Sequence, residues 1–227
     1  INNRFISLNK ISQNDLKTIA NTPGAALGST RDKPDKKYCK EILKILKIKK
    51  ISKFYYIGGN DSSDSLRIIS EYAKDIKYKL HCIHIPKTID NDLVCNDHTP
   101  GFGSAAKYVA QLFSGINYDV KSLPGVYLGI VMGRHAGFLT ASSSLLKKEN
   151  DDGPNLIYIP ESPFEINTFL NQIKSVFNKF GRCVIAISEG IQDKNKKLIS
   201  QKIIKKNEYD AHGNIQLSGT GSLGDYL

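Results

Sequence analysis

The chain has 227 residues, 40% of them hydrophobic, which predicts one globular domain, or most of one, with its own core. No apolar run approaches the roughly 20 residues that cross a bilayer, and no secretory-type leader opens the sequence, so we expect no membrane partner. The formal charge of +10 comes mainly from scattered lysines, without a basic stripe interleaved with aromatics. We therefore expect a lysine-rich solvated surface and no nucleic-acid partner. The alternative is a general attraction for anionic small substrates.

Strand-like and helical segments alternate along the chain. Apolar runs ended by glycine or proline predict strands at 53–59, 80–86, 125–133, 155–161 and 183–190. Helical spacing of apolar residues predicts helices at 61–76, 103–116, 135–148 and 166–180. This alternation predicts an α/β fold, with a doubly wound, mostly parallel sheet and helices on both faces. The polar, lysine-rich stretch 192–214 is expected to be a loop or surface excursion.

The four cysteines Cys39, Cys82, Cys95 and Cys183 show neither metal-site nor disulfide-framework spacing. Two of them, Cys82 and Cys183, stand in apolar runs, where free thiols behave as small core residues. We therefore expect a reducing, cytoplasmic environment.

Polar motifs follow the ends of the predicted strands: "GGNDS", "PKTIDND", "MGR", "PES" and "SEG". In open parallel sheets, ligands bind beyond the carboxyl ends of the strands. We therefore expect these five motifs to meet at one edge of the sheet.

The first motif, "GGNDS", joins a strand to a helix. Gly58 and Gly59 allow close approach of the backbone to a ligand, and the amides of a helix N-terminus suit an anion. Asp61 would repel a phosphate unless a divalent cation lay between them, so Asn60 and Asp61 indicate Mg²⁺. The alternative is an ordinary turn in which Asp61 or Ser62 caps the helix.

The second motif, "IPKTIDND", places Lys87, Thr88, Asp90 and Asp92 within six residues. Carboxylates crowded behind one strand repel each other and lose solvation, so a site is favoured over a structural turn, which remains the alternative. A carboxylate can accept the proton of an attacking hydroxyl, while threonine and lysine can hold phosphate oxygens.

Two further motifs add an arginine and a glutamate. In "VMGRHAGF", Gly133 allows tight backbone approach, and Arg134, expected at a helix start, offers a planar fork for phosphate. In "AISEG", Glu189 ends a buried strand and could accept hydrogen bonds from sugar hydroxyls. Each could instead be a capping residue or a surface ion pair.

These motifs, together with "HTPGFGSA", resemble in order and spacing the phosphofructokinase family, and its pyrophosphate-dependent branch in particular, over about 31–190. The resemblance implies a glycolytic phosphotransferase that uses Mg²⁺ and moves a phosphoryl group from pyrophosphate to the 1-hydroxyl of fructose 6-phosphate. It implies that Asp90 is the base, with Thr88 at the transferred group and Asp92 supporting the metal or the base. The sugar phosphate would be bound by Met132, Gly133, Arg134 and Glu189. The donor phosphates would be bound by Arg31, Gly59, Asp61 and Ser62.

The choice of donor depends on Asp61 and Lys87, where ATP-using relatives tend to carry glycine. Asp61 would fill and repel the space of an α-phosphate, and Lys87 would supply charge to a pyrophosphate leaving group. The alternatives are an ATP-dependent 6-phosphofructokinase and a non-catalytic regulatory subunit or half of such an enzyme. A kinase for nicotinamide nucleotides or lipids would leave "TIDND" and "MGR" unexplained.

The chain also departs from the family pattern. The amino-terminal glycine-rich phosphate loop is not found, Asn60 replaces a usual metal-binding aspartate, and "HGNIQLSG" (212–219) resembles the later "GHIQRGG" stretch only loosely. We therefore expect 1–227 to be a single phosphofructokinase-like catalytic region that is incomplete at both ends and inactive alone. The resemblance further implies a homo-oligomer or a two-half assembly.

Overall fold

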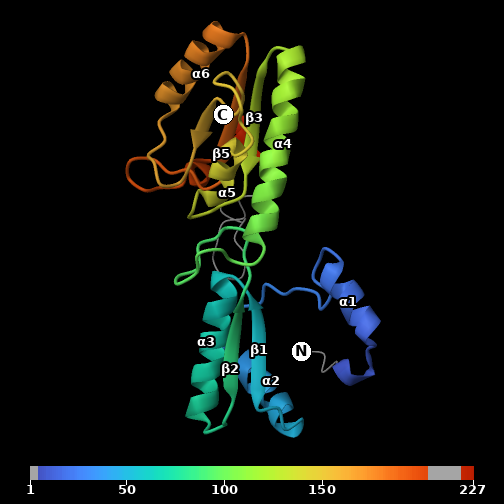
Figure 1. Cartoon of the computed structure of the whole chain (residues 1–227). Coiled ribbons are helices and arrows are strands. Elements are labelled where there is room, and N and C mark those ends of the chain that lie inside the picture. Colours follow the sequence, from blue (N-terminus) through green and yellow to red (C-terminus); the bar gives the residue numbers. More distant parts are fainter. Residues whose placement is uncertain (1–4, 204–220) are drawn as a thin grey trace. The chain divides into compact units, whose positions relative to one another are not determined.

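The computed structural model describes residues 5–203 and 221–227, which form two compact units (Figure 1). Unit 1 comprises Ile1–Tyr56 and Asp61–His84, and unit 2 comprises Ile57–Asn60 and Ile85–Leu227. None of the helices in the described ranges is both long enough and apolar enough to cross a membrane.

Unit 1 is built around α2 (Lys36–Ile48) and α3 (Asn60–Asp75), with α1 (Gln13–Asn21) preceded by a short 3-10 turn, η1 (Leu8–Lys10). The strands β1 (Lys53–Gly58) and β2 (His81–Pro86) pair as a two-stranded sheet, and their last residues belong to unit 2.

Neither α1 nor α2 was expected from the sequence. In α2, Cys39, Leu43 and Leu46 repeat at helical spacing and are buried against Ile69 and Ala73 of α3. Asp35 caps this helix by accepting a hydrogen bond of 2.7 Å from the backbone N–H of Tyr38.

Unit 2 contains a parallel three-stranded sheet in the order β3 (Val126–Val131), β5 (Cys183–Ser188), β4 (Leu156–Tyr158). The ends of β3 and β5 lie side by side, because Val131 pairs with Ser188. The unit also holds α4 (Phe102–Ser122), α5 (Phe138–Ala141), α6 (Ile166–Phe180) and α7 (Ser222–Tyr226), with 3-10 turns η2 (Ser142–Ser144) and η3 (Ile199–Lys202).

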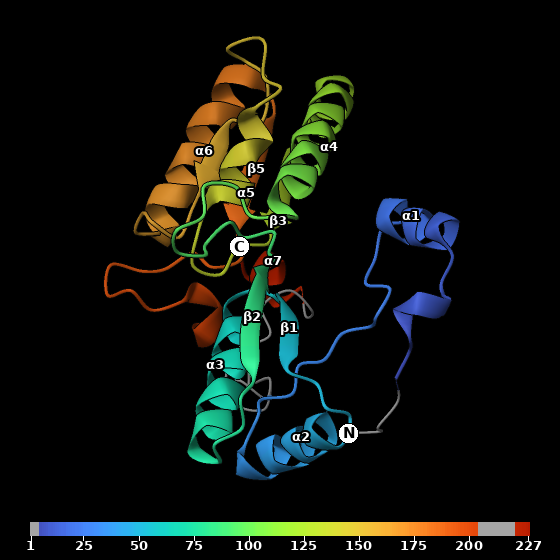
Figure 2. The ribbon, with the colours of Figure 1, turned by 60° about the horizontal axis from the view of Figure 1, so that its bottom comes forward.

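Every residue of β5 is buried, because helices cover both faces of this central strand. Val184 and Ala186 pack with Phe113 of α4, whereas Ile185 and Ile187 pack with Phe169 of α6. Figure 2 shows α4 and α6 flanking the strands of unit 2. The predicted α/β fold, with parallel strands and helices on both faces, is confirmed. The described strands divide between two sheets, a grouping that the sequence did not indicate.

One predicted helix, 135–148, is much shorter in the structure. Only α5 is α-helical, and η2 follows it directly. Ser142, Ser143 and Ser144 each donate a side-chain hydrogen bond to the carbonyl three residues earlier, at 2.6, 2.6 and 3.0 Å. Serine side chains that bond to nearby carbonyls compete with the helical ladder, which accounts for the early end of the helix.

Candidate active site

The loop after β2 carries the crowded carboxylates, and backbone hydrogen bonds fix its start. The N–H of Lys87 donates to the carbonyl of Gly58 at 3.0 Å, and the N–H of Thr88 donates to the carbonyl of Pro100 at 3.2 Å. The N–H of Asp90 donates to the Thr88 hydroxyl at 3.2 Å. A Cβ at Gly59 would lie 3.5 Å from Cβ of Thr88, so the "GG" turn touches this loop directly.

The carboxyl group of Asp90 is half-buried and stands among other charges. Burial raises the pKa of Asp90, and the neighbouring carboxylate of Asp92 raises it further. The charges of Arg134, His135 and Lys87 oppose that rise. A carboxylate with a raised pKa beside cations is suited to accept a proton in a reaction near neutral pH.

Asn60 and Asp92 offer oxygen atoms of the kind that Mg²⁺ prefers. Asn60 Nδ2 donates a hydrogen bond of 2.8 Å to Asp92 Oδ2, whereas Asp92 Oδ1 is buried and accepts no hydrogen bond from the described residues. Mg²⁺ is usually held by one or two carboxylates plus substrate phosphates. In the described part of the chain, no group of three or more His, Cys, Asp or Glu side chains is arranged to hold a metal ion. The oxygen donors present therefore fit a magnesium ion bound together with phosphates.

The turn after β3 is built by Gly133, whose φ is +141° and where a Cβ would lie 2.6 Å from the carbonyl oxygen of Ala136. The hydroxyl of Ser188 donates a hydrogen bond of 2.6 Å to the carbonyl of Gly133. Arg134 follows in a bend, and the next helix, α5, begins only at Phe138. The expectation that Arg134 starts a helix is therefore wrong, because Gly133 and Gly137 shape a turn there instead.

Glu189 stands at the end of β5 and faces the same turn. Its Oε1 accepts a long hydrogen bond of 3.4 Å from the N–H of Gly133. Burial raises the pKa of Glu189, and the charge of Asp90 adds to this, while the Gly133 N–H and Arg134 act in the opposite direction. The "TIDND", "MGR" and "SEG" motifs therefore lie near one another, although β2 belongs to a different sheet from β3 and β5.

Gly190 is a tightly packed position beside the candidate site, and the sequence did not indicate it. A Cβ there would lie 2.0 Å from the carbonyl oxygen of Arg134 and 2.6 Å from that of Gly133. Backbone atoms cannot swing aside, so only glycine allows the two strand ends to approach in this way. The sequence contains this glycine as the last residue of "SEG", but nothing in the sequence shows which backbone segment a side chain there would contact.

The remaining predicted residues differ in their placement. Met132 precedes the Gly133 turn and is 46% exposed. Arg31, Asp61 and Ser62 belong to unit 1, and their approach to the residues of unit 2 stays a prediction. Asp61 lies in the first turn of α3. The "HGNIQLSG" stretch lies outside the described residues.

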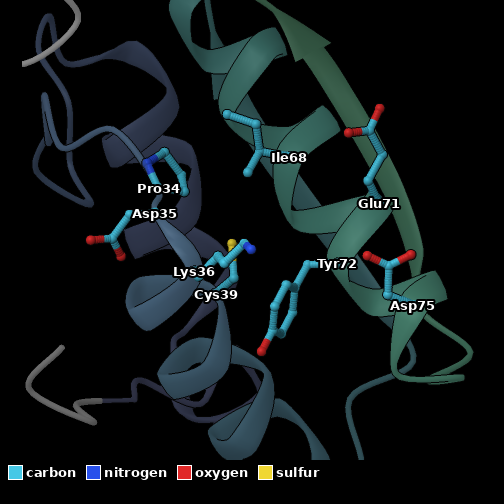
Figure 3. Close-up of a pocket in the computed structure, with 8 residues that line it drawn as sticks. All are labelled: Pro34, Asp35, Lys36, Cys39, Ile68, Glu71, Tyr72 and Asp75. Carbon is cyan, nitrogen blue, oxygen red and sulfur yellow. The ribbon is translucent and has the colours of Figure 1, made fainter.

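An open groove of about 430 Å³ lies in unit 1 between α2 and α3 (Figure 3). Cys39, Ile68 and Tyr72 contribute to its lining, and none of the predicted site residues does. Of the carboxylates around it, Asp35 caps α2, and Glu71 pairs with Arg67 at 2.8 Å.

Together, the fold and the residues at the strand ends define an α/β protein whose candidate acid–base and anion-binding residues lie beyond its parallel strands. A family model described as "Phosphofructokinase" matches residues 1–227, so the chain belongs to the phosphofructokinase family.

Relatives in this family have closely similar sequences and structures. The chain is 59% identical over 227 residues to a pyrophosphate--fructose 6-phosphate 1-phosphotransferase of Rhodospirillum rubrum, covering 100% of this chain and 56% of the relative. It is 38% identical to the enzyme of the same name from Xanthomonas campestris, covering 96% and 54%. A pyrophosphate-dependent phosphofructokinase structure from Nitrosospira multiformis aligns with a TM-score of 0.76 at 34% identity, covering 85% and 49%. The chain thus spans about half the length of the curated relatives that it matches.

Proposed function

We propose that the protein to which this chain belongs transfers a phosphoryl group from pyrophosphate to the 1-hydroxyl of fructose 6-phosphate. The products are fructose 1,6-bisphosphate and phosphate, which makes this a glycolytic step in the cytoplasm. The observation that carries the proposal is the half-buried Asp90 carboxyl, which has a raised pKa and is influenced by Asp92, Lys87 and Arg134. The names of the 59% and 38% identical relatives support the same reaction.

In the proposed reaction, Asp90 accepts the proton of the sugar 1-hydroxyl as its oxygen attacks the terminal phosphorus of pyrophosphate. The new P–O bond forms while the bridging P–O bond breaks, and phosphate leaves with the bridging oxygen. Thr88 lies beside the transferred group, and Lys87 offsets the charge on the leaving phosphate. Phosphoryl transfer of this kind depends mainly on positioning and electrostatic stabilisation.

The sugar phosphate is held by the turn after β3 and by the end of β5. Arg134 offers a guanidinium fork to the 6-phosphate, and the backbone around Met132 and Gly133 follows the sugar closely. Glu189 accepts hydrogen bonds from sugar hydroxyls. The hydrogen bond between Gly133 and Glu189 supports this arrangement, because it keeps both elements at one place.

The donor phosphates are bound by Arg31, Gly59 and Ser62, and Asp61 and Lys87 favour pyrophosphate over ATP. The negative charge of Asp61 opposes the additional phosphate of a nucleotide donor. Asn60 and Asp61 would hold Mg²⁺ beside Asp92. When bound, this ion would neutralise charge on the pyrophosphate oxygens.

The protein acts as a homo-oligomer or as an assembly of two similar halves. Support comes only from the family resemblance. An ATP-dependent enzyme is also found among the relatives, at 28% identity, so the donor needs a direct test.

The test is a donor comparison on the full-length gene product. Purified protein is supplied with fructose 6-phosphate and Mg²⁺, plus either pyrophosphate or ATP, and fructose 1,6-bisphosphate is measured. Turnover with pyrophosphate alone is the expected result. Turnover with ATP alone would support the proposed reaction at the sugar but contradict the assignment of pyrophosphate as the donor. Absence of product with both donors would favour a non-catalytic regulatory subunit.

A further inference from the structure

Asn91 stands between Asp90 and Asp92 in a backbone conformation that most residues avoid. Its φ is +58°, in the left-handed region that asparagine tolerates better than most side chains. Its side chain does not point to solvent, because the residue is only 7% exposed. The chain therefore turns between the two carboxylates at a buried residue.

The side-chain amide of Asn91 is bonded at both ends. Nδ2 donates a hydrogen bond of 3.1 Å to the carbonyl of Asp97, and Oδ1 accepts one of 2.9 Å from the N–H of Thr99. Thr99 is itself buried, and its carbonyl accepts a hydrogen bond of 3.0 Å from the N–H of Phe102, the first residue of α4. Asn91 thus ties the carboxylate segment to the start of a packed helix.

The loop that contains these residues is closed at its base by backbone contacts. Thr88 forms an isolated parallel bridge with Gly101, and its N–H donates to the carbonyl of Pro100 at 3.2 Å. Asn91 adds a side-chain brace further along the same loop. Turn and brace together determine how the chain passes from Asp90 to Asp92.

We propose that Asn91 is a positioning residue for phosphoryl transfer, which sets the directions of Asp90 and Asp92 through its left-handed turn and its amide brace. The inference rests on the proposed function, because it assigns the consequence of this brace to catalysis. The sugar phosphate is bound mainly by the separate turn at Arg134 and by Glu189. Loss of the brace therefore lowers kcat and leaves the KM for fructose 6-phosphate nearly unchanged.

The test measures steady-state kinetics and thermal unfolding for Asn91→Ala and Asn91→Gly in the full-length protein. Alanine removes the amide and disfavours the left-handed turn, so kcat falls about 100-fold, the effect of a displacement near 1 Å. Glycine removes the amide but adopts the turn freely, so kcat recovers only in part and stays about tenfold below wild type. The KM for fructose 6-phosphate stays within about threefold in both variants.

The matched control is Asn117→Ala in α4. Asn117 is also buried, and its amide is also bonded at both ends, to Asp152 Oδ1 at 2.9 Å and to the N–H of Gly153 at 2.7 Å. This variant lowers Tm but leaves kcat within about twofold of wild type. If Asn91→Ala lowers Tm in the same way and keeps its kcat, the residue is only structural and the inference fails.

Two outcomes separate this inference from the proposed function. Wild-type protein without turnover would contradict the proposed function itself. If Asn91→Ala does not fold, Asn91→Gly is the deciding variant. A wild-type kcat in Asn91→Gly would overturn the positioning role. A fall in kcat at constant KM in the folded glycine variant supports it.

Discussion

Asn60 Nδ2 donates a hydrogen bond of 2.8 Å to Oδ2 of Asp92, and this bond joins the first residue of α3 to the loop after β2, 32 residues further along the chain. It occupies one carboxylate oxygen of Asp92 and leaves Oδ1 buried without a hydrogen bond from the described residues. A buried carboxylate oxygen of this kind is stabilised by a cation or a donor from the substrate. The pair therefore orients Asp92 toward the proposed magnesium and phosphate site.

Asn60→Ala removes this orientation and should weaken magnesium binding. Loss of a residue that orients a metal ligand typically lowers metal affinity about 10- to 100-fold. The Mg²⁺ concentration at half-maximal activity should rise in that range, with little change in the KM for fructose 6-phosphate. A magnesium titration of activity measures this, with Asn171→Ala on the exposed side of α6 as the control. If the Mg²⁺ concentration at half-maximal activity does not change, the assignment of Asn60 and Asp92 to the metal site is wrong.

Asp61→Gly combined with Lys87→Gly should open the protein to ATP. Removing the carboxylate takes away the repulsion toward an additional phosphate, and removing the lysine weakens the selective attraction for pyrophosphate. The ratio of kcat/KM for ATP to that for pyrophosphate should rise at least about tenfold, a difference of about 1.4 kcal/mol. If ATP is still not used by the double variant, the donor argument is wrong.

Gly190→Ala should destabilise the contact between the two strand ends. The added Cβ would lie 2.0 Å from the carbonyl oxygen of Arg134, and the backbone around Arg134 must shift to relieve it. Overpacking of this kind lowers the free energy of unfolding by about 1–3 kcal/mol. It should also raise the KM for fructose 6-phosphate, because Arg134 moves.

Gly115→Ala is the matched control. Gly115 lies within α4, and a Cβ there would meet nothing within 4 Å. Alanine at such a helical position raises the free energy of unfolding by about 0.5–1 kcal/mol. Urea unfolding compares the two variants, and equal stability of Gly190→Ala and wild type would contradict the geometry at the strand ends.

Asp152 should contribute stability that depends on pH. Its Oδ1 accepts hydrogen bonds from Lys121 Nζ at 2.6 Å and Asn117 Nδ2 at 2.9 Å, and its Oδ2 accepts from the N–H groups of Lys148 and Glu149, both at 3.0 Å. These contacts hold the pKa of Asp152 well below its usual range, and the hydrogen bond from Lys121 contributes most. The stabilisation is therefore complete above the unfolded pKa of about 3.9 and is lost as the pH falls toward the folded pKa.

Asp152→Asn should lower the free energy of unfolding by about 2 kcal/mol near neutral pH. The difference from wild type should shrink as the pH drops below about 4. Urea unfolding at several pH values measures this, with Asp119→Asn, an exposed residue of α4, expected to change stability by less than about 0.5 kcal/mol. A difference that stays constant down to about pH 3 would exclude this linkage.

Much of the fold and the site could be predicted because the signals were local. Apolar runs ended by glycine or proline indicated the strands, and the rule for parallel sheets drew attention to "TIDND", "MGR" and "SEG", which follow strand ends. The helix 36–48 was missed although its apolar spacing was visible, with Cys39, Leu43 and Leu46 on its buried face. The grouping of strands into sheets could not be predicted, since element order does not determine which strands pair.

The supporting residues of the site were the part that sequence alone could not give. Asn91 has a positive φ, and Gly190 lies close to backbone far along the chain, and neither property is visible in local spacing. The early end of the predicted helix at 135–148 arose from serine hydrogen bonds that outweighed apolar periodicity. Reactive side chains were therefore easier to predict than the residues that hold them in place.

The most direct test of the account is the turnover of Asp90→Asn in the full-length protein, compared with its affinity for fructose 6-phosphate. The amide keeps the size of the side chain but cannot accept the proton, so kcat should fall about 10²- to 10⁴-fold. Affinity for fructose 6-phosphate, measured by calorimetry, should stay within about threefold, and the exposed Asp119→Asn should behave as wild type. An Asp90→Asn protein that turns over at the wild-type rate would contradict the assignment of this site.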